Sequence, residues 1–158
     1  SNASDALEKL RYLQSSGADL LEPEAELAIR IDFDPEKNTL SITDTGVGMT
    51  REEIIENIGA IAHSGSAQFM AQAAKDAKGA DALIGRFGVG FYSVFMVARE
   101  VTITTRSWQK DAEPVQWVST GTESYKISVA EGEVPASRIR QSWRRIQDLK
   151  QRGLAPAP

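Results

Sequence analysis

The segment LSITDTGVGMT, residues 40–50, combines the end of a strand with a glycine-rich loop. Leu40 and Ile42 alternate with polar residues, and the period of two places Asp44 on the same face as these apolar side chains. A carboxylate buried without a partner costs several kcal/mol, so Asp44 needs a hydrogen-bond donor. The segment alone leaves two roles open, a structural aspartate that caps the turn and a carboxylate that binds a ligand.

The residues that follow Asp44 suggest a site. Gly46 and Gly48 lack a Cβ, so the backbone there can adopt positive φ and a ligand can approach closely, with Met49 as an apolar wall. Thr50 and Glu53 fit a capping box at a helix N-terminus. In that helix Asn57 shares a stripe with the isoleucines at 54, 58 and 61, so we expect a buried amide that needs partners from the backbone or from a ligand.

Alternating apolar residues predict strands elsewhere in the chain. Residues 25–33 place four apolar side chains on one face and predict a strand with one buried face, joined by a turn at 34–38 to the strand at 40–43 in an antiparallel hairpin. Segments 101–106, 115–119 and 125–129 predict a meander. Helices are expected over 4–14, from 51 onward, around 68–77, and at 91–97, where a strand is the alternative. The fold class is therefore α/β (α+β), a two-layer sandwich with a mixed, mainly antiparallel sheet covered on one face by helices.

Composition limits the possible functions. The 158 residues include 18 basic and 22 acidic side chains, a net charge of −4, so a whole-surface attraction to nucleic acid or anionic lipid is not expected. The absence of cysteine excludes a disulfide framework, a thiolate nucleophile and a Cys-based zinc site, and the single histidine excludes a multi-His metal site. The most apolar stretch, residues 83–98, is interrupted by Arg86 and three glycines and cannot span a bilayer. We expect a cytoplasmic domain with no nucleic acid or membrane partner.

The C-terminal segment differs from the rest of the chain. Residues 138–158 contain six basic residues and one acidic residue, a net charge of +5. Ile139, Trp143, Ile146 and Leu149 recur at spacings of four, three and three, which predicts a basic amphipathic helix. We therefore divide the chain into a domain at 1–135 and a divergent basic tail at 136–158. The tail helix can be an ordinary terminal helix or a contact for a membrane surface, a nucleic acid or an acidic partner.

Two further groups of residues suggest ligand binding only in combination. Asn2, Asp5 and Lys9 share one helix face, which by itself is an ordinary N-terminal helix. The segment GRFGVG, residues 85–90, supplies three glycines ahead of an apolar segment, an arrangement in which backbone N–H groups bind phosphate. It has neither the Rossmann spacing nor the Lys-Ser/Thr of a P-loop. A catalytic pairing of His63 with Ser64 is not supported, because adjacent residues do not face one another on a helix and no third group orients them.

Three segments in order are more specific than any one of them: NASDAL at 2–7, DTGVGMT at 44–50 and GRFGVGFYS at 85–93. In this order the sequence resembles the N-terminal ATP-binding domain of the heat-shock protein 90 chaperone family, most closely its bacterial type, over roughly residues 2–129. The wider superfamily (GHKL) also contains gyrase B, MutL and sensor histidine kinases. The FGVGFYS sequence and the SDAL helix favour the chaperone branch. Another superfamily ATPase domain and a degenerate, non-catalytic interaction module are the alternatives.

The resemblance implies a Bergerat-type ATP-binding fold that binds ATP or ADP with Mg²⁺. In it Asp44 would accept the adenine amino group, and Asn2 would give a side-chain oxygen to Mg²⁺, whose other ligands are phosphate oxygens and waters. Residues 59–90 would form the ATP lid. The other residues implied to line the nucleotide site are Asp5, Lys9, Gly48, Met49, Asn57 and His63, with backbone amides for the phosphates at Gly88, Val89, Gly90 and Phe91.

The sequence departs from the family pattern at both ends. The family's general base is a glutamate one helical turn before the position of Asn2, which lies outside this sequence, so we expect no catalytic residue here and little or no ATP hydrolysis. After Pro135 the family has a Gly-Thr pair and an apolar strand, where this sequence has Ala136-Ser137 and the basic tail, so we expect the sheet to lack its first and last strands. Implied partners are an adenine nucleotide and, through the full-length parent, client proteins. We expect a monomer unless an exposed sheet edge pairs.

Overall fold

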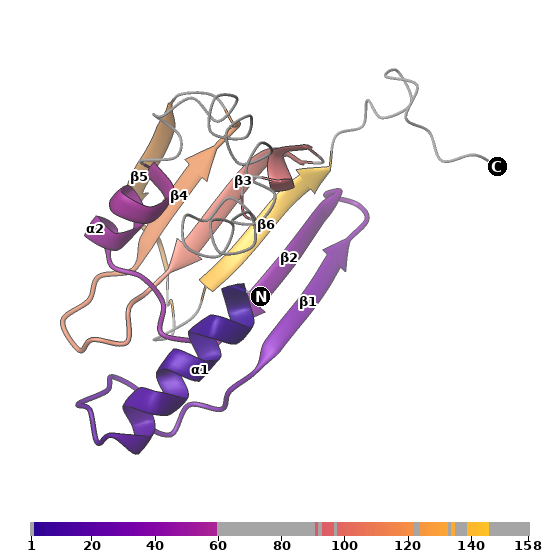
Figure 1. Cartoon of the computed structure of the whole chain (residues 1–158). Coiled ribbons are helices and arrows are strands. Elements are labelled where there is room, and N and C mark those ends of the chain that lie inside the picture. Colours follow the sequence, from indigo (N-terminus) through magenta and orange to yellow (C-terminus); the bar gives the residue numbers. More distant parts are fainter. Residues whose placement is uncertain are drawn as a thin grey trace, which may run out of the picture.

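The computed structural model describes residues 2–59, 91, 93–96, 98–121, 124–132, 134 and 139–145. Six strands form one sheet in the order β1-β2-β6-β3-β4-β5 (Figure 1). Their bounds are Ile29–Asp34 (β1), Thr39–Asp44 (β2), Ala98–Thr105 (β3), Val115–Ser119 (β4), Tyr125–Val129 (β5) and Ile139–Arg145 (β6). Every pairing among these strands is antiparallel, so the described sheet contains no parallel pair. The hairpin and the meander predicted from alternation are confirmed.

The described helices lie on one side of the sheet (Figure 1). Helix α1, Asn2–Ser15, confirms the predicted N-terminal helix. Helix α2, Arg51–Ile54, continues directly as a π-helical turn, Ile55–Gly59, and a short 3₁₀ helix covers Ser93–Met96. The predicted capping box is present: the Glu53 N–H donates to Thr50 Oγ1 at 3.2 Å, and the Thr50 N–H donates to Glu53 Oε2 at 2.7 Å. The helix expected around residues 68–77 lies outside the described residues.

The main hydrophobic core lies between α2 and strands β3 and β4. Ile54 and Ile58 of the predicted stripe are both buried, as expected. They pack against the strand residues that alternate inward from the meander. Together the buried cluster comprises Ile54, Ile58, Phe91, Ala98, Val101, Ile103, Val115 and Trp117.

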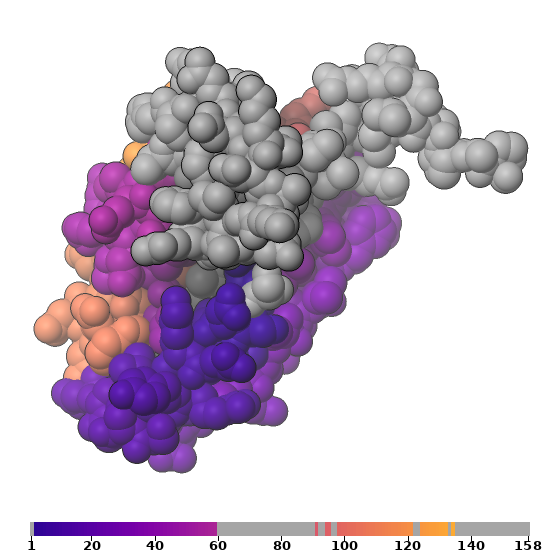
Figure 2. Space-filling model, viewed as in Figure 1, coloured from indigo at the N-terminus to yellow at the C-terminus, as the bar shows by residue number. Residues whose placement is uncertain are grey.

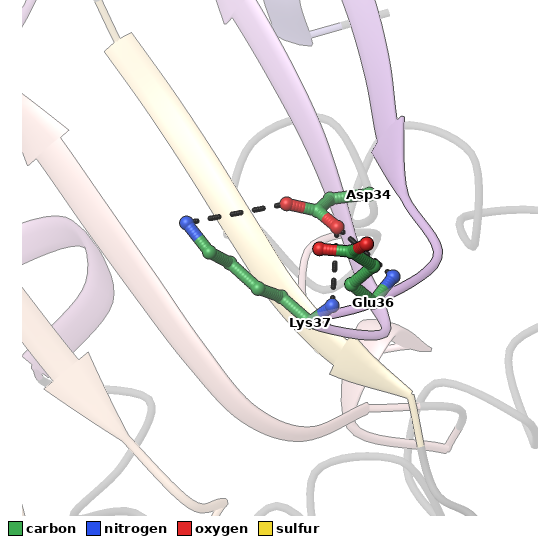
Figure 3. Close-up of polar contacts among 3 residues, drawn as sticks. All are labelled: Asp34, Glu36 and Lys37. Atoms are coloured by element: carbon green, nitrogen blue, oxygen red, sulfur yellow. Dashed lines mark hydrogen bonds and ion pairs between the residues drawn. The ribbon is translucent and has the colours of Figure 1, made fainter.

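The turn between β1 and β2 is built by its first residue. Asp34 Oδ1 accepts hydrogen bonds from the N–H groups of Glu36 and Lys37, at 3.0 and 3.1 Å, and Lys37 Nζ lies 4.0 Å from Asp34 Oδ2 (Figure 3). Asn38 adopts φ 51°, a left-handed conformation that asparagine tolerates better than most residues. These features close the hairpin and fix its register, in which Ile31 lies opposite Ile42.

The buried face expected for residues 25–33 is wrong. Ile29, Ile31 and Phe33 are 44%, 66% and 58% exposed. The alternation correctly predicts a strand, but β1 is the last strand at one edge of the sheet, and α1 packs against β2 and the loop that follows it. Among the described residues no helix covers β1. In Figure 2 the residues of β1 and β2 are visible to the right of α1.

The helix predicted for the basic tail is also wrong where the structure describes it. Residues Ile139–Arg145 form strand β6, which lies between β2 and β3 rather than outside the sheet. Ile139 is opposite Asp44 on one side and opposite Thr105 on the other. Without β6, the facing edges of β2 and β3 would each leave backbone N–H and C=O groups without hydrogen bonds. A strand between them forms hydrogen bonds with both edges, whereas a terminal helix would leave both edges unpaired. The expected loss of the last strand is therefore corrected, and the sheet extends past residue 135.

Candidate functional site

Asp44 is the centre of the candidate site. It ends β2 and is only 3% exposed, as its position in the alternation predicts. Its Oδ1 accepts a hydrogen bond from the Gly46 N–H at 2.9 Å, so the turn-capping role is real. Burial raises the pKa of Asp44 from 3.8 to about 6, and the Gly46 hydrogen bond opposes this rise only in part.

The second oxygen of Asp44 is the chemically informative atom. Among the described residues, Gly46 provides the one hydrogen bond to this carboxylate. A carboxylate can accept several hydrogen bonds, so Asp44 has acceptor capacity beyond the bond from Gly46. The site therefore has the capacity to bind a donor group, such as an amino group, next to the start of the glycine loop.

The loop at residues 45–49 is held in place on both sides. The Val47 N–H donates to the Ala6 carbonyl of α1 at 3.2 Å, while the Val47 carbonyl accepts from the Trp108 N–H at 2.8 Å. The Met49 N–H donates to Thr105 Oγ1 at 3.1 Å. These bonds join α1, the loop and the end of β3, so Asp44 projects from a rigid frame.

The two loop glycines pack tightly against neighbouring parts of the chain. Positive φ was expected at both glycines and is confirmed at Gly48, which has φ 63°, but not at Gly46. A Cβ at Gly48 would collide with the Arg106 carbonyl, and a Cβ at Gly46 would collide with Ala6. The chain itself fills the space beside both glycines. They permit close packing of the loop against α1 and the end of β3.

Helix α1 carries three candidate residues, of which Lys9 lies beside the loop. Asn2, Asp5 and Lys9 are all exposed on α1. Lys9 and Val47 both line an open groove of about 450 Å³, whose other lining residues are Glu8, Tyr12 and Leu13. The part of the chain that the structure describes contains no cluster of three or more His, Asp or Glu side chains placed to hold a metal ion.

The remaining candidate residues differ in how far they are buried. Met49 is half-buried and packs against the hydrophobic core. Asn57 is exposed, and the expectation that its amide is buried is wrong, because the helix changes to a π-helical turn at Ile55 and the stripe no longer follows the α-helical period. Phe91 is buried, with its ring 5.9 Å from Trp117 in an edge-on arrangement. His63, Gly88, Val89 and Gly90 lie outside the described residues, as does nearly all of the expected lid.

Sequence reasoning missed Thr105. It is fully buried at the end of β3 and holds the loop through Met49, yet it carries the same signal as Asp44, a polar residue in the apolar parity of a strand. Ser107, two residues later, is 1% exposed, and its Oγ has no hydrogen-bond partner among the described residues. Ser107 continues the alternation of Val101, Ile103 and Thr105 but lies beyond the strand predicted at 101–106.

Comparison with known proteins shows the family to which the chain belongs. Residues 12–149 match the family model described as histidine kinase-, DNA gyrase B- and HSP90-like ATPase. The chain belongs to this family. The match covers the Asp44 loop and continues through β6, beyond the boundary expected at residue 135.

The relatives of the chain come from the HSP90 branch of this family. It is 53% identical to Chaperone protein HtpG of Desulfitobacterium hafniense over 129 residues, which are 81% of this chain and 21% of the relative. It is 50% identical to HtpG of Nitratidesulfovibrio vulgaris over 139 residues, 85% of this chain and 22% of the relative. The chain thus spans about a fifth of the length of these relatives. In the described residues, no helix is long and apolar enough to cross a membrane.

Proposed function

We propose that this domain binds ATP or ADP and that Asp44 recognises the adenine base. The observation that carries the proposal is a carboxylate only 3% exposed that accepts one hydrogen bond among the described residues. The exocyclic amino group of adenine is a donor and would supply a second hydrogen bond. The description of the family as ATPases gives the ligand class, and Asp44 follows a strand and precedes a glycine loop as the family resemblance requires.

The other site residues follow from the same proposal. Met49 would contact the base, and Asp5, Lys9, Gly48 and Asn57 would line the rest of the pocket. Asn2 would provide one oxygen to Mg²⁺, a ligand type that this hard cation prefers, with the phosphates and water completing its shell. His63 and the amides of Gly88, Val89, Gly90 and Phe91 would contact the phosphates, and residues 59–90 would close over them.

The activity of the parent protein is proposed from its relatives. Their name, Chaperone protein HtpG, supports a chaperone as the parent protein. The resemblance to the heat-shock protein 90 family implies that it is driven by ATP and acts on client proteins in the cytoplasm. The basic amphipathic helix that supported a degenerate interaction module is absent from residues 139–145, so nucleotide binding is the better-supported function.

Calorimetry with ADP and Mg²⁺ tests the proposal. The unmodified polypeptide should bind, and Asp44→Asn should reduce affinity by about 100-fold or more, because the new amide would point a donor at the adenine amino group. Asp111→Asn is the matched control, since it removes an exposed carboxylate from the turn before β4 and should leave affinity unchanged. Equal binding by the unmodified and Asp44→Asn proteins would contradict the adenine role. Absence of binding by the unmodified protein would contradict the nucleotide proposal as a whole.

A further inference from the structure

Strand β1 presents an apolar surface at an edge of the sheet. Ile29, Ile31 and Phe33 lie on alternate positions and are exposed, although they share a face with the inward residues of β2. β1 is the terminal strand in the described sheet, so no described strand pairs with its outer side. A six-residue edge with three exposed apolar side chains is a template for another strand.

The hydrogen bonds of the hairpin show which backbone groups this edge offers. The Thr45 N–H donates to the Ala28 carbonyl at 3.1 Å, so Ala28 directs its backbone groups toward β2. In an antiparallel pair this direction alternates, and the backbone groups of Arg30 and Asp32 therefore also face β2. The N–H and C=O groups of Ile29, Ile31 and Phe33 consequently point outward, away from the sheet.

We propose that two copies of this chain associate through β1, antiparallel, about a two-fold axis at Ile31. In this register Ile31 lies opposite Ile31 of the second copy, and Ile29 lies opposite Phe33. The outward backbone groups of all three residues then pair reciprocally, as a two-fold interface requires. Two six-stranded sheets would join into one, and the three exposed apolar side chains of each copy would become neighbours across the axis.

Charge selects this register over its neighbours. With the axis at Ile31, Arg30 lies opposite Asp32 of the second copy, and the pair occurs twice. These are positions without ladder hydrogen bonds, where facing side chains are closest. Moving the axis to position 30 would place two Arg30 side chains opposite each other. Moving it to position 32 would oppose two Asp32 side chains and bring Pro35, which has no N–H, opposite Ile29.

The contact is small, so association should depend strongly on concentration. One strand and three apolar side chains per copy form an interface smaller than the roughly 1,600 Å² of a standard complex. Sedimentation of the 158-residue polypeptide up to about 1 mM should show its mass rise from 17.2 kDa toward twice that value. A single species of 17.2 kDa at every concentration would overturn the proposal.

A charge exchange tests the register itself. Arg30→Asp and Asp32→Arg each create like-charge pairs across the axis and should each weaken self-association at least tenfold. Mixed in equal amounts, these two variants should associate with each other, because every facing pair is again opposite in charge, and the double variant should self-associate. Asp111→Arg makes the same charge change as Asp32→Arg on an exposed turn outside the interface and should associate normally.

The outcome of the mixing experiment discriminates between occupants of the edge. Failure of the two single variants to associate when mixed would overturn the register, even if the unmodified chain dimerises by another surface. Slowed amide exchange at Ile29, Ile31 and Phe33 on association, with the amides of Arg30 and Asp32 protected at all concentrations, would support it. The test needs no nucleotide, so its result is independent of the proposed function.

Discussion

Replacing Asp44 by asparagine should stabilise the fold while it damages the binding site. The amide oxygen of asparagine can keep the hydrogen bond from the Gly46 N–H, which is 2.9 Å from Oδ1 in the native site. The substitution removes the negative charge from a side chain that is almost completely buried. The substitution therefore measures the free-energy cost of the buried charge on Asp44, while the hydrogen bond that caps the turn is kept.

The magnitude follows from the pKa of Asp44. Folding raises this pKa from 3.8 to about 6, and at about 1.4 kcal/mol for each tenfold change in proton affinity the difference corresponds to about 3 kcal/mol. Because the folded pKa is the higher one, protonation of Asp44 favours the native state. This contribution to the free energy of unfolding is fully present below pH 3.8 and is lost as pH rises through about 6. Above that pH the native protein holds an ionised carboxylate in a dry site, and Asp44→Asn does not.

Urea denaturation of both proteins between pH 4 and pH 8 measures this effect, since the difference between them cancels the titration of every other group. Asp44→Asn should be more stable by about 3 kcal/mol at pH 7.5, and the difference should shrink toward zero near pH 4. A variant that is less stable than the native protein at pH 7.5 would refute the reasoning. So would a stability difference that does not change with pH.

Three further predictions concern the loop and the sheet. Gly48→Ala should lose about 2 kcal/mol or more beyond Gly17→Ala in urea denaturation, because both glycines have positive φ but only the first has a backbone carbonyl where the Cβ would lie. Thr105→Val, which keeps the side-chain shape, should cost about 1–3 kcal/mol in the same assay by leaving the Met49 N–H without its acceptor. Cross-strand NOEs should connect residues 139–145 to both β2 and β3, and sequential helical NOEs there instead would restore the helical interpretation.

Local patterns in the sequence were sufficient for most of the described elements. The first helix, the hairpin, the meander and the capping box each depend on residues close together in the chain, and each is confirmed. Asp44 was identified for the same reason, because strand parity alone placed it on the buried face. The positive φ of Gly48 was predicted from the residue type.

The errors concern what is adjacent in space but distant in sequence. The parity of Ile31 is correct, but its exposure depends on how far α1 extends over the sheet. The exposure of Asn57 depends on a π-helical turn that no propensity predicts. Thr105, like Asp44, is a polar residue at a buried position of a strand. Its hydrogen bond to the Met49 N–H could not be predicted, because it depends on the loop at residues 45–49 lying beside β3. For residues 139–145, a helical spacing competed with the unpaired edges of β2 and β3, and backbone pairing prevailed.

The position of β6 has a consequence for how the chain folds. It is the last described strand in sequence but lies inside the sheet, where it pairs with Asp44 about 95 residues earlier. Without β6 the β1–β2 hairpin and the β3–β5 meander are two separate sheets, each with an open edge. During synthesis both pieces can form early, yet they can join only after residues 139–145 have left the ribosome. Folding should therefore be slow and limited by this late closure, and the interval before it is when the nascent chain is most exposed to misassociation.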